Sequence, residues 1–433
     1  MQQFASKMDA FIQEYCRLFH FSGNILVTCR DEVIYRRSFG MADAENGIAN
    51  TQDTVFNLYS ISKPFCAIGL LRLVDKGLVD LDAHPGKYVP EASGFSEKLT
   101  IRNMLHHSSG MPDFRHYDHI RHSGWSVRQQ VAYLAQQPML FEPGTDTLYG
   151  NINFTLAALV IENVSGMDYY AYMQQEVFAP LGAKTITYRK TQESLDALAQ
   201  GYDFSEDKYV PVNRSGDPMM GAGDLQGTVE DVFCLNQAIK HKMLLKPETW
   251  EEVLSPGPIS TFGFGCRITQ WHGKHRITHN GGATGFRTLH IQLPDDDLDI
   301  IVLSNNGWGN CRSTIPAAIY NAFYGAPRSA DSAVEMDAGY IQAVGGSAVL
   351  KTKDGVTLPA FAPAFECPEQ LVGDYGNFRI EKDGDGVKVI YPSGKVICCY
   401  MGDKALMNRY FDEAYPVVQG EDGTVSVFGC KKK

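Results

Sequence analysis

The sequence predicts an α/β (α+β) fold, in which an antiparallel sheet flanked by helices carries a mainly helical inserted region. Strand-like segments occur near the start of the chain, at 24–39, and again at 263–304. Between them, from residue 60 to about residue 245, most apolar residues recur at helical spacing. After Leu371 the chain changes to short alternating segments separated by turns, which predict a small C-terminal antiparallel β-barrel-like domain.

The individual elements follow from local patterns. Aromatic and aliphatic side chains between Phe4 and Phe19 recur at helical spacing, which predicts an amphipathic helix of the fold and not a signal peptide. A hairpin is expected across Arg30-Asp31-Glu32. Helices are then expected at 60–76, 100–107, 126–136, 151–164, 168–178 and 228–241. An antiparallel meander is expected at 263–269, 276–279, 286–292 and 300–304, with a closing helix at 315–324.

The chain has 433 residues, which is beyond the usual limit for one hydrophobic core. We predict a main domain at 1–328, a linker rich in Ala, Gly, Pro and Ser at 329–366, and the small antiparallel β domain at 367–433.

Composition excludes several classes of partner. The net charge of −11 disfavours nucleic acid and anionic membranes as partners. No apolar run approaches the length of a membrane span. Ten cysteines are scattered without a C-x-x-C motif, which favours reduced thiols and a cytoplasmic location. The sequence leaves the oligomeric state open.

Ser60 and Lys63 form an S-x-x-K pair at the start of a strongly apolar helix. Residues three apart share one helical face, so the Lys63 amine would lie beside the Ser60 hydroxyl. Partial burial would lower the pKa of the amine, and a neutral amine can take the hydroxyl proton. We therefore predict that Ser60 is a nucleophile and Lys63 its activating base. The alternative is an N-cap serine with a solvated lysine, and a second S-x-x-K match occurs at Ser205 and Lys208.

Tyr149 and Asn151 stand just before the helix expected at 151–164. The tyrosine could exchange a proton with the nucleophile or the leaving group, and the asparagine amide could hold Lys63 or a substrate carbonyl. The alternative is a packed tyrosine with an N-capping asparagine, and Tyr375-Gly-Asn377 repeats the pattern.

The segment His279-Asn280-Gly281-Gly282 ends a predicted strand. Glycines let a substrate approach the backbone, and the Gly282 N–H could pair with the Ser60 N–H as an oxyanion hole. The alternative is a turn with a surface histidine, which also fits the two other H-x-G matches, at His84 and His122.

Histidines and aspartates are crowded between residues 106 and 122. His116, His119 and His122 recur every three residues, so they could share a helical face and bind a metal. Because Asp113, Arg115 and Arg121 mark a polar surface stretch, we expect no metal and no other cofactor.

The order and spacing of Ser60-x-x-Lys63, Tyr149-Gly-Asn151 and His279-Asn-Gly281 resemble the serine β-lactamase and penicillin-binding-protein superfamily. Within it, the chain resembles the branch of class C β-lactamases, D-aminopeptidases, D,D-carboxypeptidases and related esterases. The resemblance spans about residues 5–325 and includes Phe21–Val27, Leu105–Pro112, Gly221–Leu225 with Thr228, and Leu303–Asn305. The second of these segments gives His107 a structural role in place of metal binding.

This resemblance implies acyl transfer through an acyl-enzyme on Ser60, with Lys63 or Tyr149 as the base. The expected substrate is a small molecule or short peptide with an amide, peptide or ester bond, including bonds to D-residues. His279 stands where β-lactamases and many penicillin-binding proteins carry lysine. The loss of that permanent cation argues against efficient β-lactam hydrolysis and favours an aminopeptidase, amidase or esterase.

Three alternatives stay open at this point. The chain could be a catalytically silent relative that binds a ligand, or a metallohydrolase that uses the His106–His122 segment. Within the main interpretation, it could be a carboxylesterase and not a peptidase.

Overall fold

The computed structural model describes residues 2–121, 123–188, 198–205, 208–212, 219–283, 285–309, 311–324, 368–383, 386–392, 396–402, 405–408, 414–419, 424–427 and 430–432. The linker predicted at 329–366 lies outside these residues, so the domain boundaries stay a prediction.

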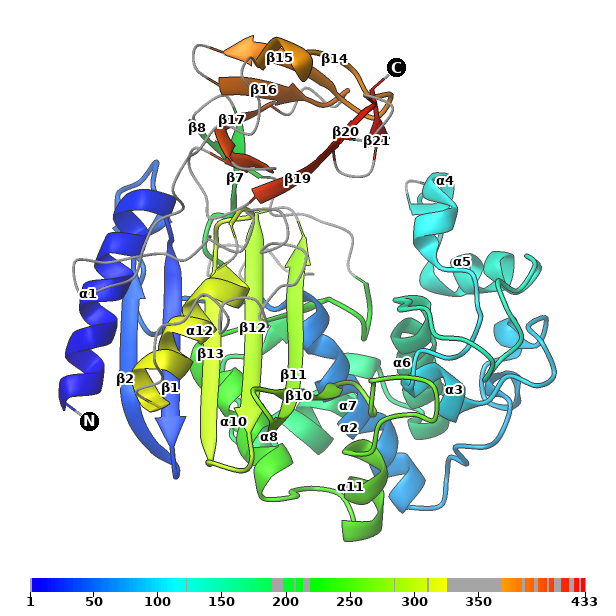
Figure 1. Cartoon of the computed structure of the whole chain (residues 1–433). Helices are drawn as coiled ribbons and strands as arrows, with labels where there is room; N and C mark the ends of the chain where they lie inside the picture. The colour runs from blue at the N-terminus through cyan, green and yellow to red at the C-terminus, as the bar shows by residue number, and fades with distance from the viewer. Residues whose placement is uncertain are drawn as a thin grey trace.

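A six-stranded antiparallel sheet forms the centre of the larger part of the chain, in the order β10-β11-β12-β13-β1-β2 (Figure 1). Its strands are β1 (Gly23–Cys29), β2 (Glu32–Phe39), β10 (Arg267–Trp271), β11 (Lys274–Ala283), β12 (Phe286–Leu293) and β13 (Leu298–Ser304). The register of β1 and β13 runs from Gly23 opposite Ser304 to Cys29 opposite Leu298. The predicted α/β fold, with one sheet built from both ends of the domain, is therefore confirmed.

Helices cover both faces of this sheet. Side chains alternate along a strand, and Ile300 and Val302 accordingly belong to one buried cluster whereas Ile301 and Leu303 belong to another. The first cluster includes apolar residues of α1 (Gln2–Phe19) and α12 (Cys311–Tyr324), which lie on one face of the sheet in Figure 1. The second cluster faces the inserted helical region.

The inserted region is mainly helical, as predicted. Its α-helices are α2 (Ser62–Asp75), α3 (Ile101–Leu105), α4 (Asp118–Arg121), α5 (Val127–Leu134), α6 (Ile152–Ser165), α7 (Tyr169–Met173), α8 (Ala179–Leu181), α10 (Val229–Lys240) and α11 (Pro247–Val253). One turn of π-helix, η5 (Gln174–Phe178), joins α7 to α8. Shorter 3₁₀ turns are η1 (Tyr59–Ile61), η2 (Pro85–Lys87), η3 (Pro90–Ala92) and η4 (Phe114–His116).

Short strands connect these helices to one another. They are β3 (Met41–Asp43), β4 (Ile48–Ala49), β5 (Phe56–Asn57), β6 (Thr187–Tyr188), β7 (Tyr202–Ser205), β8 (Lys208–Pro211) and β9 (Leu225–Gly227). β9 pairs with both β5 and β6, so it ties residue 225 to the segment just before Ser60. The sequence did not predict the hairpin β7–β8 or helix α11. The strand expected at 263–269 begins only at Arg267, because a turn hydrogen bond joins Gly263 N to Cys266 O at 2.9 Å.

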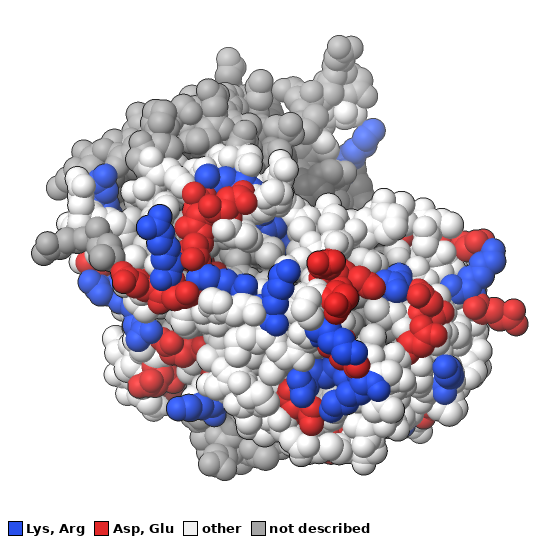
Figure 2. Space-filling view, turned by 90° about the horizontal axis from the view of Figure 1, so that it is seen from below, with Lys and Arg blue, Asp and Glu red and all other residues white. Residues whose placement is uncertain are grey.

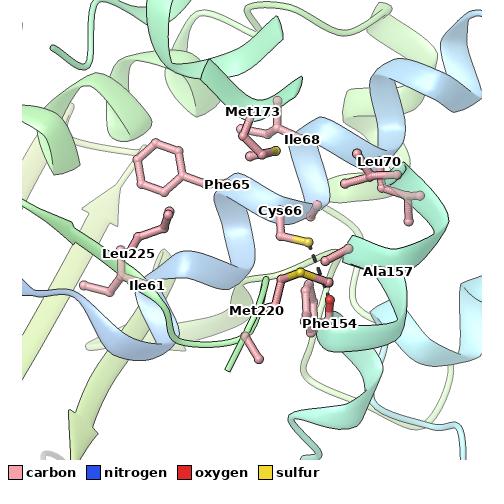
Figure 3. Packing of buried hydrophobic residues seen from close by; sticks show 14 of the residues in the cluster. Ile61, Phe65, Cys66, Ile68, Leu70, Phe154, Ala157, Met173, Met220 and Leu225 are labelled. Carbon is pink, nitrogen blue, oxygen red and sulfur yellow. Dashed lines mark hydrogen bonds between the residues drawn. The ribbon is translucent and has the colours of Figure 1, made fainter. Parts of the chain in front are cut away.

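Helix α2 is the buried axis of the inserted region. Its side chains are apolar nearly all round, and Phe65, Leu70 and Leu71 are completely buried. Figure 3 shows Phe65, Cys66 and Ile68 of α2 packed between residues of α6, α7 and the segment at 220–225. Gly77, with φ of +72°, donates its N–H to Val74 O and ends the helix.

The C-terminal residues form an eight-stranded antiparallel sheet in the order β14 to β21. A 3₁₀ turn, η6 (Pro368–Gln370), precedes the strands β14 (Gly373–Asp374), β15 (Arg379–Asp383), β16 (Gly386–Ile390), β17 (Val396–Gly402), β18 (Ala405–Asn408), β19 (Ala414–Gln419), β20 (Val425–Val427) and β21 (Cys430–Lys431). The predicted antiparallel arrangement is confirmed. The described strands show no pairing of β14 with β21, so closure into a barrel stays a prediction. Trp308 of the larger part packs into the buried cluster of this sheet.

The surface carries charges of both signs. Figure 2 shows Lys, Arg, Asp and Glu side chains interspersed over one face of the molecule. Among the helices described, none is long and apolar enough to cross a membrane.

Candidate active site

Ser60 lies on a tight turn that precedes α2. The turn η1 holds Ser60, and α2 begins two residues later than the start predicted for the helix. Tyr59 has a φ of +48°, a left-handed conformation that costs a non-glycine residue free energy and is found most often at functional sites. Ser62 Oγ accepts the Leu225 N–H at 3.0 Å and so fixes the base of the turn. Ile61 is the N-cap residue of α2, so the N-cap alternative for Ser60 is wrong.

Lys63 is completely buried, with an exposed fraction of 0%. Its Nζ lies 3.0 Å from Ser60 Oγ, 2.9 Å from Asn151 Oδ1 and 2.6 Å from the Ala222 carbonyl oxygen. The amine also lies 4.8 Å from the centroid of the Tyr149 ring. The alternative of a solvated lysine is therefore wrong. The Ala222 carbonyl is a site group that the sequence did not reveal, because a backbone acceptor leaves no signature in the side-chain pattern.

Tyr149 donates its hydroxyl to Ser60 Oγ at 2.8 Å. Its ring packs on the buried His107, with centroids 4.4 Å apart, and on Phe262, with centroids 5.7 Å apart. His107 Nδ1 accepts hydrogen bonds from Gly150 N at 3.3 Å and from Asn153 Nδ2 at 3.0 Å. His107 thus positions the tyrosine, in keeping with the structural role that the resemblance implied.

Asn151 begins α6, but its side chain makes no capping hydrogen bond. Asp113 caps this helix instead, because its Oδ2 accepts the N–H groups of Asn151 and Ile152. Asp113 is 1% exposed, so our expectation that it belongs to a polar surface stretch is wrong. A cap supplied from 38 residues away has no local sequence signal.

His279 lies on β11 and is 5% exposed, which rules out the alternative of a surface histidine. Its Nδ1–H donates to the Asn280 carbonyl at 2.7 Å, and its buried Nε2 has no hydrogen-bond partner in the described part of the chain. Burial, and then the charge of Lys63, holds the pKa of His279 well below its usual value. The ring is therefore neutral at pH 7, with the proton on Nδ1 and a bare acceptor at Nε2.

Gly281 brings the end of β11 against the turn that holds Ser60. A Cβ on this residue would lie 2.2 Å from Leu58 O and 3.1 Å from Ser60 N, so only glycine fits. Thr288 Oγ1 donates to Leu58 O at 2.9 Å, and Arg312 Nη1 donates to Gly281 O at 3.1 Å. Asn280 and Gly282 are the neighbours of Gly281 on β11. The Ser60 and Gly282 amides therefore belong to two backbone segments that meet at Ser60.

The other occurrences of the three motifs lie elsewhere in the fold. Ser205 and Lys208 belong to the hairpin β7–β8, and Tyr375 packs inside the C-terminal sheet. His84 accepts the Gly86 N–H and caps a 3₁₀ turn, whereas His122 lies outside the described residues. The fold thus gathers one copy of each motif at Ser60.

The histidine-rich segment is engaged in local contacts. His106 donates to Phe262 O at 2.7 Å, His116 Nδ1 accepts the Asp113 N–H at 2.9 Å, and His119 packs on Tyr133. Over the described ranges, which omit His122, no group of three or more His, Cys, Asp or Glu side chains is placed to hold a metal ion.

Residues 19–312 match the sequence model of the Beta-lactamase family. The chain belongs to the Beta-lactamase family. It is 28% identical over 318 residues to penicillin-binding protein 4* of Bacillus subtilis (strain 168), across 66% of this chain and 68% of that protein. The predicted superfamily is therefore confirmed.

Solved structures show the same fold at lower identity. The octameric penicillin-binding protein homologue from Pyrococcus abyssi superposes with a TM-score of 0.67 at 20% identity, over 98% of each chain. The D-amino acid amidase from Ochrobactrum anthropi SV3, complexed with L-phenylalanine amide, gives 0.64 at 21% identity, over 75% of this chain and 98% of that one.

Proposed function

We propose that the protein is a serine hydrolase that works through an acyl-enzyme on Ser60. The observation that carries this proposal is the position of Ser60 Oγ, 3.0 Å from the buried Lys63 amine and 2.8 Å from the Tyr149 hydroxyl. A nucleophile within hydrogen-bond reach of a base, which is itself oriented by further groups, is the general pattern of covalent catalysis.

Lys63 is proposed to act as the base in its neutral form. The protonated amine has three N–H groups, one for each of its oxygen neighbours Ser60 Oγ, Asn151 Oδ1 and Ala222 O, at 3.0, 2.9 and 2.6 Å. After loss of one proton, two N–H groups stay with Asn151 and Ala222, and the lone pair faces the Ser60 hydroxyl. Ser60 Oγ then attacks the substrate carbonyl carbon while its proton passes to Lys63.

This attack forms a tetrahedral intermediate. It becomes the acyl-enzyme when the bond from the carbonyl carbon to the leaving group breaks. Tyr149, which donates to Ser60 Oγ, is placed to pass its proton to the leaving amine or alcohol, and Lys63 then passes the proton that it took to the Tyr149 oxygen, which restores both groups. Water then attacks the acyl-enzyme, and the same groups release the acid and restore Ser60. Which of Lys63 and Tyr149 takes the first proton is tested by the variants below.

The backbone N–H groups of Ser60 and Gly282 are proposed to bind the oxyanion. The close approach of Gly281 to Leu58 and Ser60 supports this, because it sets the end of β11 beside the nucleophile turn. One such donor is typically worth about 10²–10³-fold in rate.

His279 supports a substrate that needs no cation at this place. Its ring is neutral and its Nε2 is buried, so it supplies no charge to pair with a substrate carboxylate. We propose small amides, peptides or esters as substrates, including those of D-amino acids. Efficient β-lactam hydrolysis is not expected.

A substrate panel tests the proposal. D- and L-aminoacyl amides, short esters and a β-lactam are incubated with wild-type protein, Ser60→Ala and the control Ser205→Ala. We expect turnover of an amide or ester by wild type and by Ser205→Ala, and none by Ser60→Ala. Turnover that survives in Ser60→Ala, or that a chelator abolishes, would refute the acyl-enzyme. No turnover by wild type would favour the silent binding protein.

A further inference from the structure

The segment Gly221–Leu225 supplies the carbonyl that holds Lys63. Ala222 N and Gly223 N both donate to Met219 O at 2.8 Å, and this tight turn presents Ala222 O to the amine. Gly221 has a φ of +72°, and a Cβ there would lie 2.6 Å from Phe154 O. The turn is therefore pressed against α6, and Figure 3 shows the neighbouring Met220 beside Phe154.

The buried side chain of Asp224 accepts a hydrogen bond from the backbone of this turn. It is 1% exposed, and its Oδ2 accepts the Gly221 N–H at 3.0 Å and the Tyr170 hydroxyl at 2.7 Å. Its other oxygen, Oδ1, is buried without a partner among the described residues. Burying a carboxylate in this way is costly, and burial raises the pKa of Asp224. This cost raises the question of which part of the fold the buried Asp224 carboxylate stabilises.

Tyr170 is itself held rigidly. It lies at the start of α7, where Asp168 Oδ1 accepts its backbone N–H at 3.0 Å. Its ring stacks on Tyr188 with centroids 3.5 Å apart and an interplanar angle of 6°. The Tyr170 hydroxyl is therefore a fixed point against which the Asp224 carboxylate is placed.

The residue after Asp224 connects the turn to the nucleophile. Leu225 donates its N–H to Ser62 Oγ and accepts the Leu58 N–H at 2.9 Å. Asp224 thus stands between the carbonyl that binds Lys63 and the strand that supports the Ser60 turn. Its charge also acts on Lys63, since the two attract each other electrostatically.

We propose that Asp224, held by Tyr170, is a positioning residue that fixes the Ala222 carbonyl against the Lys63 amine. This inference rests on the proposed function for its effect on rate, but its structural part does not. Without the carboxylate, the Gly221 N–H loses its acceptor and the turn relaxes. Lys63 then loses one of its two carbonyl partners, and its lone pair is no longer directed at Ser60.

The test uses Asp224→Ala, Asp224→Asn and Tyr170→Phe, with Tyr169→Phe as the matched control. Tyr169 is also on α7 and completely buried, yet its hydroxyl makes no hydrogen bond to Asp224. The first readout is amide hydrogen exchange of the peptide covering 219–225, measured without substrate. We expect about tenfold faster exchange in Asp224→Ala and Tyr170→Phe, and wild-type exchange in Asp224→Asn, which keeps an acceptor oxygen, and in Tyr169→Phe.

The second readout is the rate at which a fluorophosphonate probe forms an adduct. For Asp224→Ala and Tyr170→Phe we expect a maximal rate at least fivefold lower, an unchanged half-saturating probe concentration, and rescue by Asp224→Asn. Unchanged exchange in both variants, or equal effects of Tyr169→Phe and Tyr170→Phe, would overturn the inference. Should wild type form no adduct with the probe or with a smaller acylating ester, the proposed function fails, and the exchange data alone decide whether Asp224 fixes the turn. If Asp224→Ala does not fold, Tyr170→Phe and Asp224→Asn carry the test.

Discussion

Asn151 directs its side-chain oxygen at the Lys63 amine, at 2.9 Å, and not at the end of the helix that it begins. An asparagine at this position could either contact the Lys63 amine or cap α6, and in this structure two different residues perform these tasks. Asn151 accepts a hydrogen bond from Lys63, and the buried Asp113 caps α6.

This division predicts opposite behaviour for two variants. Asn151→Ala should lower kcat by about 10- to 100-fold, since hydrogen bonds to charged or ionisable groups contribute about 1.5–3 kcal/mol, and should leave the melting temperature near that of wild type. Asp113→Ala should lower the free energy of unfolding by about 1–2 kcal/mol through loss of the cap. Steady-state kinetics and thermal unfolding of both variants check this. A large loss of stability in Asn151→Ala would show that it serves the helix after all.

Lys63→Met should lower both activity and stability. The variant keeps a long apolar stem but removes the proposed base, so the acylation rate of the folded protein should fall by about 10²–10⁴-fold. Because the Asn151 and Ala222 oxygens lose a buried donor, the free energy of unfolding should fall by about 1–3 kcal/mol. Tyr149→Phe is the companion variant. If it reduces the rate more than Lys63→Met does, the tyrosine and not the lysine takes the first proton.

Gly281→Ala and Gly282→Ala should differ sharply although the residues are adjacent. A Cβ at Gly281 meets the Leu58 carbonyl oxygen at 2.2 Å, which requires the backbone to move, so we expect lower stability and little activity. A Cβ at Gly282 meets the arginine side-chain atoms Arg312 Nη1 and Arg287 Cδ, at 3.1 and 3.3 Å, and the Phe286 carbonyl oxygen at an ordinary contact distance of 3.4 Å. Gly282→Ala keeps its N–H and should retain activity within a few-fold. A Gly282→Ala variant that is as stable as wild type but inactive would contradict this prediction. It would mean that a methyl group at residue 282 prevents the Gly282 N–H from binding the substrate.

The buried His279 predicts a pH dependence of stability. Its pKa is lowered in the folded protein, whereas an unfolded histidine titrates near 6.5, so below that pH the unfolded chain binds more protons. Stability should therefore fall as the pH drops below 6.5, with a contribution of about 1 kcal/mol per pH unit from this residue. His290, whose pKa burial lowers to about 3, acts in the same direction. Denaturant unfolding between pH 5 and 7 should show a shallower slope in His279→Asn, and an equal slope would contradict a neutral buried ring.

Asp299 should oppose this trend. Burial raises its pKa to about 6, so its own contribution to stability is greatest at low pH and is lost as the pH rises from about 4 to 6. The comparison of wild type with His279→Asn at each pH removes this term, because both proteins carry Asp299.

Much of the fold could be predicted from periodicity. Helix α2 was visible because it is apolar nearly all round. The antiparallel meander was visible because β13 is a short apolar run whose residues alternate between two buried clusters, and β12 alternates apolar residues of one cluster with polar residues. The start of α2 was misplaced by two residues, since a 3₁₀ turn and the left-handed Tyr59 precede it. No sequence pattern predicts the left-handed backbone conformation of Tyr59.

The candidate site was visible only in part. Each motif occurs more than once, and only the fold brings Ser60, Lys63, Tyr149 and His279 together. Asp113 and the Ala222 carbonyl escaped prediction because one acts across 38 residues and the other through the backbone. The burial of His279 also depends on packing that a single sequence does not display.

The most direct test of the account is intact-mass spectrometry after incubation with a fluorophosphonate probe. We predict one adduct on wild type and on Ser205→Ala, and none on Ser60→Ala with an unchanged melting temperature. An adduct that persists in Ser60→Ala, or a wild-type protein that neither the probe nor a smaller acylating ester modifies, would contradict the claim that Ser60 is an activated nucleophile.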